Sequence, residues 1–449
     1  MLKIGEKIEI SITAFGSEGQ GVGRADNIAV FVPGALPGEK VVAEVIKTEK
    51  WFAVARLEKL LSEAPERCIP PCPYYRSCGG CGLMHMDYSA QLAFKTRRVR
   101  DALERIGGLE GIRVEACVPS PEIARYRNKG VFTFSERNGK IVSGCLSEKS
   151  HTVVPIADCL IEKPEAIAAL RAVTDWANAH GITAYDERTG RGELRHLMVR
   201  TASTGEMMAV IVTKGGLHFE NELIETLKKA LPGLSGIIQN ENPDRTALIL
   251  GRRSRVIYGS GIIAEKIGDL SFSVGAESFL QVNSAQTPNL YKAAIDALGL
   301  SENDDVIDLY CGIGTISLMM AKRARSVLGI EYVPQAIEDA MRNAARNGIE
   351  NAEFICGAAE NVLPKLVKSG HKIDKLLLDP PRKGAMPSAI EAIIASGVKD
   401  IAYISCNPAT LARDCRILAD AGYAIESVQP YDMFANSFHV ECVVSLSRK

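Results

Sequence analysis

Residues 401–414 read Ile401-Ala-Tyr-Ile-Ser-Cys-Asn-Pro-Ala-Thr-Leu-Ala-Arg-Asp414, an apolar run followed by a turn and a helical pattern. The apolar run ends at Ser405, Cys406 lies at the turn, and Pro408 opens the helix. In an α/β sheet, ligands and chemistry gather at the carboxyl ends of the strands, and a thiolate is the strongest nucleophile that a side chain offers. Because most cysteines are buried and inert, the role of Cys406 depends on what else lies at that edge.

Alternating strands and helices extend over the C-terminal part of the chain, which we place at residues 276–449. Strand-like runs occur at residues 306–310, 326–331, 353–355, 375–379 and 401–405, with helical stretches between them. This alternation predicts a doubly wound, Rossmann-like α/β domain with a parallel sheet. Two more strands, at residues 424–428 and 440–446, are expected to complete the sheet, the last of them antiparallel.

The first of these strands leads into a glycine-containing turn, Asp308-Leu-Tyr-Cys-Gly-Ile-Gly-Thr315. Gly312 and Gly314 let a ligand approach the backbone, and the N-terminus of the next helix faces it. Glu331 ends the second strand about 20 residues after the glycines, where a carboxylate can accept ribose hydroxyls. Ser317 replaces the third glycine of the dinucleotide fingerprint. This departure disfavours NAD and favours S-adenosylmethionine, which has no pyrophosphate.

Two further motifs carry carboxylates that could reach the same site. In Asp379-Pro-Pro-Arg-Lys-Gly384 the prolines make a rigid, extended bend, which would hold the Asp379 carboxylate between cofactor and substrate. In His439-Val-Glu441 a carboxylate follows a histidine in an apolar strand, which favours a functional role for Glu441 over a structural one. Phe279-Leu-Gln-Val-Asn283 precedes the domain, and its Gln281 offers an amide donor and acceptor.

The preceding residues are expected to form two other domains. Residues 1–60 contain short strands at 7–12, 28–32, 40–47 and 51–57, with a glycine-rich turn at 16–23, and predict a small OB-like β-barrel. Residues 61–275 mix strand-like and helical segments and predict an α+β domain with a mostly antiparallel sheet. Within them, residues 83–106 read as a helix stopped by two glycines, and this helix is expected to pack on the C-terminal domain.

The run Cys72-Pro-Tyr-Tyr-Arg-Ser-Cys-Gly-Gly-Cys81 places three cysteines on a glycine-rich loop, where backbone can approach the sulfurs closely. Such spacing indicates a metal centre when the chain is not a secreted disulfide protein. A four-cysteine zinc site and a [4Fe–4S] cluster both fit, and both need a fourth ligand. Cys159 is the preferred candidate, with Cys68 and Cys145 as alternatives.

The composition, with 46% hydrophobic and 24% charged residues, is that of a globular protein. The apolar runs are too short to cross a bilayer, and residues 1–6 lack the apolar core of a signal peptide. We therefore expect a cytoplasmic protein without a membrane partner. The formal net charge of −1 does not by itself indicate a nucleic-acid partner. Basic clusters at residues 95–100, 125–129 and 252–255 are more often solvated surface than binding patches.

In their order along the chain, these motifs resemble those of the RNA uracil-5 methyltransferase family. The resemblance rests on Phe-x-Gln-Val-Asn (279–283), Asp-Leu-Tyr-Cys-Gly-x-Gly-Thr (308–315), Asp-Pro-Pro-Arg-Lys-Gly (379–384), Ser-Cys-Asn-Pro-Ala-Thr-Leu-Ala-Arg-Asp (405–414) and His-Val-Glu (439–441). The cysteine loop and the N-terminal strands, which resemble a TRAM domain, extend it over nearly the whole chain. Both features are similar to the branch that acts on 23S ribosomal RNA, whereas the smaller tRNA-acting members generally lack them.

The resemblance implies S-adenosylmethionine as methyl donor and a uridine flipped out of an RNA loop as substrate, bound by a monomeric enzyme. It implies a [4Fe–4S] cluster, with zinc as the alternative, held by Cys72, Cys78, Cys81 and Cys159. It places the cofactor contacts on Gln281, Tyr310, Glu331 and Asp379. It also makes Cys406 the nucleophile and Glu441 the base. Ala358 stands where relatives often carry a polar residue near the adenine.

Other functions remain open at this point. A tRNA uracil-5 methyltransferase, or a non-catalytic RNA-binding or ribosome-assembly protein, would share many of these features. A cytosine-5 methyltransferase also uses a cysteine, but its nucleophile lies in a different motif. A radical enzyme with the same cofactor needs an open iron, usually on a C-x3-C-x2-C run, and the x5 spacing after Cys72 disfavours it.

Overall fold

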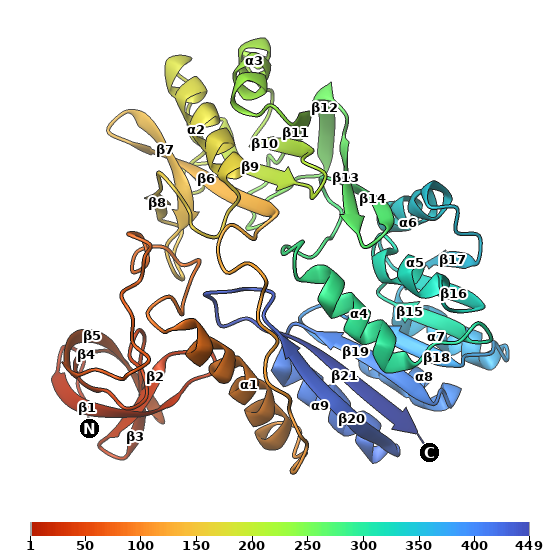
Figure 1. The fold of residues 1–449 in the computed structure, drawn as a ribbon. Coiled ribbons are helices and arrows are strands. Elements are labelled where there is room, and N and C mark those ends of the chain that lie inside the picture. Colours follow the sequence, from red (N-terminus) through yellow and green to blue (C-terminus); the bar gives the residue numbers. More distant parts are fainter. Residues whose placement is uncertain (1, 449) are drawn as a thin grey trace.

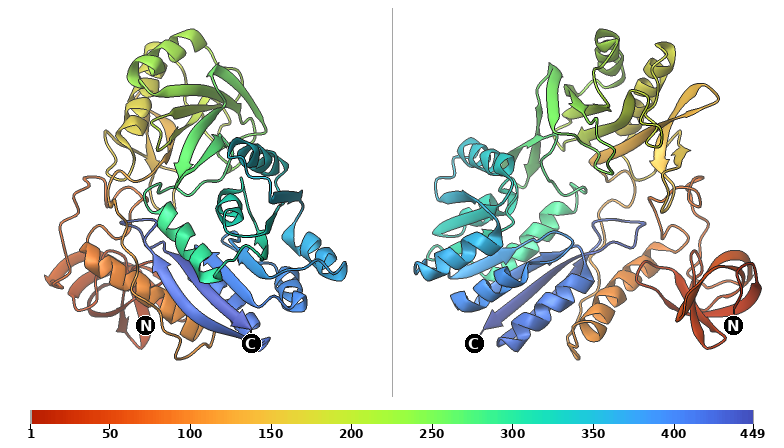
Figure 2. Two further views of the ribbon diagram at one scale, coloured as in Figure 1. Left: turned by 45° about the vertical axis from the view of Figure 1, so that its right-hand side comes forward. Right: turned by 180° about the vertical axis from the view of Figure 1, so that it is seen from behind.

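The computed structural model describes residues 2–448, which form three bodies. Figure 1 shows a small barrel at the N-terminal end, a middle sheet carrying two helices, and a C-terminal sheet covered by helices on both faces. The views in Figure 2 show the same three bodies from the side and from behind. Within residues 2–448, every helix is too short or too polar to cross a membrane.

The N-terminal body is a closed barrel with the strand order β1-β2-β3-β5-β4. Its strands are β1 (Lys7–Phe15), β2 (Gly21–Ala25), β3 (Ile28–Val32), β4 (Lys40–Thr48) and β5 (Phe52–Ser62). In β4, Val41, Ala43 and Val45 are buried in the barrel interior while the residues between them are more exposed, the alternation expected of a barrel strand. The predicted OB-like barrel is confirmed.

One part of the barrel was predicted wrongly. The segment read as a glycine-rich turn contains β2, which pairs with β1 and β3. A Cβ added at Gly23 would lie 2.5 Å from the Ser11 carbonyl oxygen, and one at Gly21 would lie 2.7 Å from that of Ala35. These glycines therefore permit close approach of neighbouring backbone within a strand, which single-sequence patterns do not distinguish from a turn.

Helix α1 (Tyr88–Arg105) connects the barrel to the C-terminal body. The expected helix over residues 83–106 starts five positions too early, because the Asp87 side chain accepts a hydrogen bond of 2.8 Å from the Ala90 N–H and caps the helix there. Phe94 packs edge-on against Phe15 of the barrel, with ring centroids 5.1 Å apart. On its other side, Val99 belongs to the apolar core that also holds the C-terminal sheet.

The middle body contains a sheet with the order β12-β11-β10-β9-β6-β7-β8. Its neighbouring strands run antiparallel except for the parallel pair β10 and β11. Two helices cover one face and close an apolar core against it. The elements are β6 (Lys129–Arg137), β7 (Lys140–Leu146), β8 (Val153–Pro155), α2 (Pro164–Ala179), β9 (Leu194–Thr201), β10 (Met207–Thr213), α3 (Glu220–Ala230), β11 (Leu234–Glu241) and β12 (Arg253–Gly259).

The hairpin of β13 (Ile262–Ile267) and β14 (Leu270–Gly275) leads into the C-terminal body. The sheet there has the order β17-β16-β15-β18-β19-β21-β20. Its strands are β15 (Asp305–Leu309), β16 (Ser326–Glu331), β17 (Ala352–Cys356), β18 (Lys375–Leu378), β19 (Asp400–Ser405), β20 (Tyr423–Tyr431) and β21 (Glu441–Arg448). Strands β15 to β19 are parallel, and β21 is antiparallel to both β19 and β20. The doubly wound prediction and the antiparallel last strand are confirmed.

Helices cover both faces of this sheet, so its strands are apolar on both sides. They are α4 (Thr287–Leu298), α5 (Thr315–Ala321), α6 (Pro334–Arg346), α7 (Ala359–Lys368), α8 (Pro387–Ser396) and α9 (Pro408–Asp420). In β19, Ile401 and Tyr403 belong to the core under α8, α9 and α1, whereas Ala402 and Ile404 belong to the core under α4. The residues that directly follow the parallel strands lie along one edge of the sheet, and the candidate site is at this edge.

Candidate active site

Cys406 and Glu441 come together through the pairing of β19 with β21. The last rung of this antiparallel ladder joins Ser405 to Cys442. Continuing the register by one position sets Cys406, the residue after β19, opposite Glu441, the first residue of β21. Cys406 is partly exposed, and Glu441 is 3% exposed. The thiol is therefore open to a substrate while the carboxylate lies behind it.

The surroundings raise the pKa of both groups. Burial and the charges of Glu441 and Asp379 raise the pKa of the Cys406 thiol to about 11. Burial and the charge of Asp379 raise the pKa of Glu441 well above its usual value. Among the described residues, no group hydrogen-bonds Glu441 Oε2, although that atom is buried. An unpartnered buried carboxyl oxygen is costly in a structural role, and such oxygens are typical of functional sites.

Asp379 and Arg382 lie on the rigid loop that follows β18. Burial and the nearby Asp308 carboxylate raise the pKa of Asp379 to about 7. Arg382 opposes this accumulation of negative charge, since it lowers the pKa of both Cys406 and Glu441. Sequence reasoning singled out Asp379 in this motif but missed Arg382. Its place three residues after Asp379, in a motif already assigned to the site, was the available signal.

The glycine turn after β15 adopts the strained geometry of a ligand-binding loop. Tyr310 has a φ of 66° and Gly314 a φ of 80°, the left-handed region that non-glycine residues seldom adopt. The Glu331 carboxylate at the end of β16 accepts hydrogen bonds from the N–H groups of Gly312 at 3.2 Å, Tyr332 at 2.8 Å and Val333 at 3.0 Å. Glu331 is thereby held beside the glycine turn, as the predicted ribose contact requires.

Two polar side chains of this region, Ser317 and Tyr310, differ in their hydrogen bonding. Ser317 donates a hydrogen bond of 2.5 Å to the buried Asp308 carboxylate, so the residue replacing the third glycine ties the first turn of α5 to β15. The Tyr310 hydroxyl is buried and has no hydrogen-bond partner within residues 2–448. Burial raises its pKa to about 12, with a further contribution from Glu360. A hydroxyl of this kind is available to a ligand.

Gln281 lies on the loop that precedes α4 and is 4% exposed. The start of β6 anchors this loop: the Asn128 side chain donates to the Gln281 carbonyl at 2.9 Å, and the Asn128 N–H donates to the Val282 carbonyl at 2.9 Å. Phe279, two residues earlier, is 62% exposed. The structure thus gives Gln281 a rigid backbone position and leaves a large aromatic ring uncovered beside it.

The segment between β20 and β21, which delivers Glu441, is held by α1. Lys95 and Asp432 form a fully buried ion pair with Nζ and Oδ1 2.5 Å apart. Arg98 donates to the Phe438 carbonyl at 2.8 Å. The start of β21 therefore depends on a helix more than 300 residues earlier in the chain. No local sequence pattern indicates this dependence.

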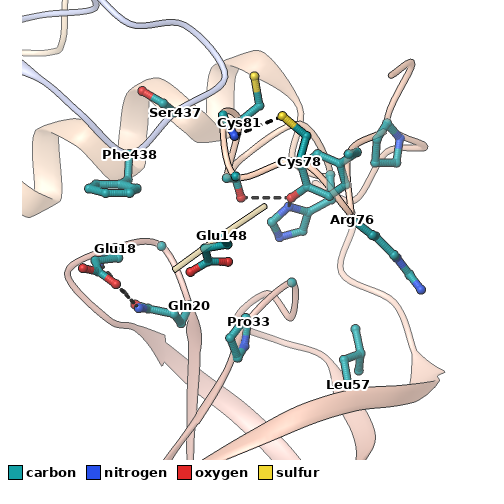
Figure 3. A pocket seen from close by; sticks show the side chains of 18 of the residues that line it. Glu18, Gln20, Pro33, Leu57, Arg76, Cys78, Cys81, Glu148, Ser437 and Phe438 are labelled. Carbon is teal, nitrogen blue, oxygen red and sulfur yellow. Dashed lines mark hydrogen bonds between the residues drawn. The ribbon is translucent and has the colours of Figure 1, made fainter. Parts of the chain in front are cut away.

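The cysteine loop lies next to a cleft of about 480 Å³ between the barrel and the segment of Phe438. Figure 3 shows Cys78 and Cys81 on one side of this cleft, with Glu18 and Gln20 of the barrel on the other. The Gly80 N–H donates to the Cys78 sulfur at 3.4 Å. A Cβ at Gly79 would lie 2.9 Å from the Glu148 backbone, so the loop packs tightly against the strand that ends just after Cys145.

The predicted metal ligands lie near one another. Burial raises the pKa of Cys81 to about 12, and the charges of Cys159, Cys78 and Cys72 contribute. Cys145 hydrogen-bonds Cys78 and lowers its pKa to about 6. Cys68 instead donates to the Met84 carbonyl. Within residues 2–448, however, no group of three or more His, Cys, Asp or Glu side chains is arranged to hold a metal ion. The metal centre expected from the sequence is therefore not shown by this arrangement.

These features define a class of protein. A strained glycine turn, a carboxylate at the end of the second strand and a thiol–carboxyl pair share one edge of a doubly wound sheet. This arrangement is typical of an enzyme that binds a nucleoside-bearing cofactor at the edge of the sheet, here with a partly exposed cysteine beside it.

Comparison with known proteins identifies a family within this class of enzymes. The family described as tRNA (uracil-5-)-methyltransferase matches residues 251–449, and the TRAM domain matches residues 2–57. An uncharacterized RNA methyltransferase of Caldanaerobacter subterraneus subsp. tengcongensis is 45% identical over 449 residues, covering 100% of this chain and 99% of that one. One from Halalkalibacterium halodurans is 42% identical over 444 residues, covering 98% and 97%.

A solved structure is also similar over nearly its whole length. It is the tRNA (uracil-54, C5)-methyltransferase of Pyrococcus abyssi in complex with S-adenosyl-L-homocysteine. The TM-score is 0.79 at 28% identity, with 98% of this chain and 100% of that chain covered. The chain belongs to the RNA uracil-5 methyltransferase family and is an S-adenosylmethionine-dependent enzyme with an N-terminal TRAM domain.

Proposed function

We propose that the protein methylates C5 of a specific uridine in 23S ribosomal RNA through a covalent bond between Cys406 and C6 of the base. The observation that carries this proposal is the pairing of β19 with β21, which sets a partly exposed thiol opposite a buried, unpartnered carboxyl group. The reaction of the family, methyl transfer to C5 of uracil, is one to which a thiol and a neighbouring carboxyl group are suited.

The proposed reaction needs a nucleophile because C5 of uracil is too weak to attack a methyl sulfonium unaided. The Cys406 thiolate bonds to C6, and the C5–C6 π electrons shift to C5 and O4 as an enolate. When bound, S-adenosylmethionine would supply the electrophilic methyl group that C5 accepts, with S-adenosylhomocysteine as the leaving group. Glu441 then takes the C5 proton, the double bond reforms, and Cys406 leaves as a thiolate.

The surrounding charges support this order of events. Arg382 favours the thiolate that starts the reaction, since it lowers the pKa of Cys406. A carboxyl of raised pKa is a strong base once it has lost its proton, so Glu441 suits the proton-removal step. Asp379 would hydrogen-bond the uracil edge and hold the ring. The proposed contacts to S-adenosylmethionine are Gln281, Tyr310, Glu331 and Asp379.

We further propose that Cys72, Cys78, Cys81 and Cys159 hold a [4Fe–4S] cluster. The support is the donor set: three thiols on the glycine-rich loop and Cys159 near them, with the pKa of Cys81 raised by the charges of the other three. When bound, such a cluster would tie the cysteine loop to the segment before α2 and stiffen the wall of the cleft in Figure 3. A zinc ion on the same ligands is the alternative.

The choice of ribosomal RNA rests on the cysteine loop and the barrel, which resemble those of the branch that acts on 23S ribosomal RNA. The similarity to a tRNA (uracil-54, C5)-methyltransferase favours tRNA as the second candidate. Incubation with labelled S-adenosylmethionine and either unmodified 23S ribosomal RNA or unmodified tRNA, followed by mass mapping of 5-methyluridine, tests this proposal. Label in 23S RNA alone supports it, and label in tRNA alone would contradict it.

A further inference from the structure

Two cationic residues of the middle sheet, Lys129 and Arg200, lie directly opposite each other on neighbouring strands. Lys129, the first residue of β6, is the direct antiparallel partner of Arg200 on β9. Directly opposed residues in a sheet project to the same face, and like charges in that position destabilise the pairing. The basic cluster at residues 125–129, read from the sequence as solvated surface, therefore includes a residue whose placement is unfavourable without a counter-charge.

The other cations of this region are neutralised by carboxylates. Arg125 pairs with Asp158 and Arg127 with Glu162. Among residues 2–448, no carboxylate forms an ion pair with Lys129 or Arg200.

Arg200 is 4% exposed, and its Nε has no partner within the described residues. Burial and the charges of Arg200 and Arg127 lower the pKa of Lys129 to about 8, as expected for an ammonium without a counter-ion.

These two cations stand at a cleft of about 370 Å³. The next pair on the same face of the ladder, Val131 and Met198, gives the cleft an apolar floor, and Ile249 and Leu250 add an apolar wall. Glu277 also lines the cleft, at an exposed position and without an ion pair to either cation. An apolar floor beside two cations matches a nucleotide, which has a flat apolar base and an anionic phosphate.

The cleft shares a wall with the active-site loop. Ala276 and Glu277 line it, and the same loop continues to Gln281 five residues later. Arg200 donates hydrogen bonds to the carbonyls of Ala276, at 3.1 Å, and Ser278. A group bound between Lys129 and Arg200 is thus joined through one short loop to the edge where uridine is methylated.

We propose that this cleft binds a nucleotide of the RNA substrate that flanks the target uridine, with its phosphate on Lys129 and Arg200 and its base on the Val131–Met198 floor. This inference rests on the RNA-directed activity proposed above and applies to either RNA. Phosphate contacts fix the register of a nucleic acid on its protein, so the cleft would help to select which uridine reaches Cys406. Lys129 and Arg200 act here as positioning residues.

The test compares three variants with the wild-type protein. Lys129→Gln removes the free cation, Lys129→Arg keeps it, and Lys228→Gln removes a lysine of the same body that is paired with Glu225 on α3. The dissociation constant for a short fluorescein-labelled single-stranded RNA is measured by anisotropy from about 50 to about 200 mM salt. Binding of S-adenosylmethionine is measured by calorimetry, and thermal melting confirms folding.

We expect Lys129→Gln to weaken RNA binding by about 3- to 10-fold and to reduce the salt slope by roughly one counter-ion. Lys129→Arg and Lys228→Gln should bind RNA as the wild type does, and cofactor binding should be unchanged in every variant. Equal RNA affinity and slope in Lys129→Gln and Lys228→Gln would overturn the inference. A loss confined to S-adenosylmethionine binding would also overturn it, because the anion would then belong to the cofactor.

Methyl transfer by the wild-type protein is measured in parallel and separates this inference from the proposed function. Wild-type transfer together with unaltered RNA binding by Lys129→Gln overturns the nucleotide cleft alone. Absence of transfer by the wild type to any RNA contradicts the proposed function and removes the basis of the inference with it.

Discussion

Cys406 lies opposite Glu441 because β21 runs antiparallel to β19 and its ladder ends one position earlier, at Ser405 and Cys442. A parallel final strand would carry Glu441 to the other end of the sheet, since the carboxyl ends of parallel strands share an edge. The reversal of this one strand therefore brings two residues 35 positions apart into one site.

Replacement of the nucleophile should separate chemistry from binding. Cys406→Ala removes the sulfur that bonds to C6, so we expect methyl transfer to be abolished. Its affinity for S-adenosylmethionine should be unchanged, because the proposed cofactor contacts lie on the glycine turn and Glu331. Transfer assays and calorimetry check both statements, with Cys356→Ala, an exposed cysteine outside the proposed catalytic residues, as the control. Transfer by Cys406→Ala at the wild-type rate would remove covalent catalysis from the account.

Replacement of the base should stop the reaction after methyl transfer. Glu441→Gln cannot take the C5 proton, so the methylated RNA should remain bonded to Cys406. Denaturing electrophoresis with labelled cofactor should show label that migrates with a protein–RNA adduct. Normal release of methylated product by this variant would exclude Glu441 as the base.

The reactivity of Cys406 should depend steeply on pH. Because its pKa is raised to about 11, the thiolate is a minor form near neutrality and increases as the pH rises. We expect the rate of iodoacetamide labelling at Cys406 to rise about tenfold per pH unit from about pH 7 to about pH 9. Arg382→Gln should slow labelling at each pH, since Arg382 lowers this pKa. A rate independent of pH in that range would contradict the assigned environment.

The Lys95–Asp432 pair should be important for stability. Asp432→Asn leaves the fully buried Lys95 ammonium without its carboxylate, and we expect a loss of about 3 kcal/mol in the free energy of unfolding. Lys292→Gln, which breaks an exposed pair with Asp296, should cost less than about 1 kcal/mol. Denaturant unfolding monitored by circular dichroism compares the two. Similar losses would mean that the buried pair does not anchor the segment leading to Glu441.

The metal proposal can be tested by composition. Protein purified without oxygen should contain iron and acid-labile sulfide in equal amounts, and Cys159→Ala should lose both if Cys159 is the fourth ligand. Zinc without sulfide would identify the alternative site. A matched Cys145→Ala variant should keep the metal, since Cys145 only hydrogen-bonds Cys78 in this assignment. If Cys159→Ala retained iron and Cys145→Ala lost it, Cys145 would be the fourth ligand in place of Cys159.

Much of the fold could be predicted because its signals are local. The buried parallel strands of the C-terminal sheet are short apolar runs, and Gly312 marks the turn between the first strand and helix. Two other features were missed, one because it depends on distant contacts and the other because a local helix cap was overlooked. The strand β2 exists because Gly21 and Gly23 admit neighbouring backbone, and α1 begins at Tyr88 because the Asp87 side chain caps it.

The residues of the site also divide into those that local motifs indicate and those that only the structure reveals. Cys406, Asp379 and Glu441 stand in motifs whose residue types already suggest chemistry. Arg382 stands in the same motif as Asp379 but was missed, because its importance comes from its effect on the pKa of Cys406 and Glu441. The opposition of Lys129 and Arg200 appears only once the register of β6 and β9 is known.

The most direct test of the central claim is trapping with RNA that carries 5-fluorouridine. After methyl transfer, C5 bears fluorine in place of the proton, so Glu441 has no proton to remove and the bond from Cys406 to C6 cannot be released. Digestion and mass spectrometry should find the methylated fluorouridine on the peptide that contains Cys406. Absence of any adduct under conditions that methylate ordinary RNA, or an adduct on a different cysteine, would contradict the account.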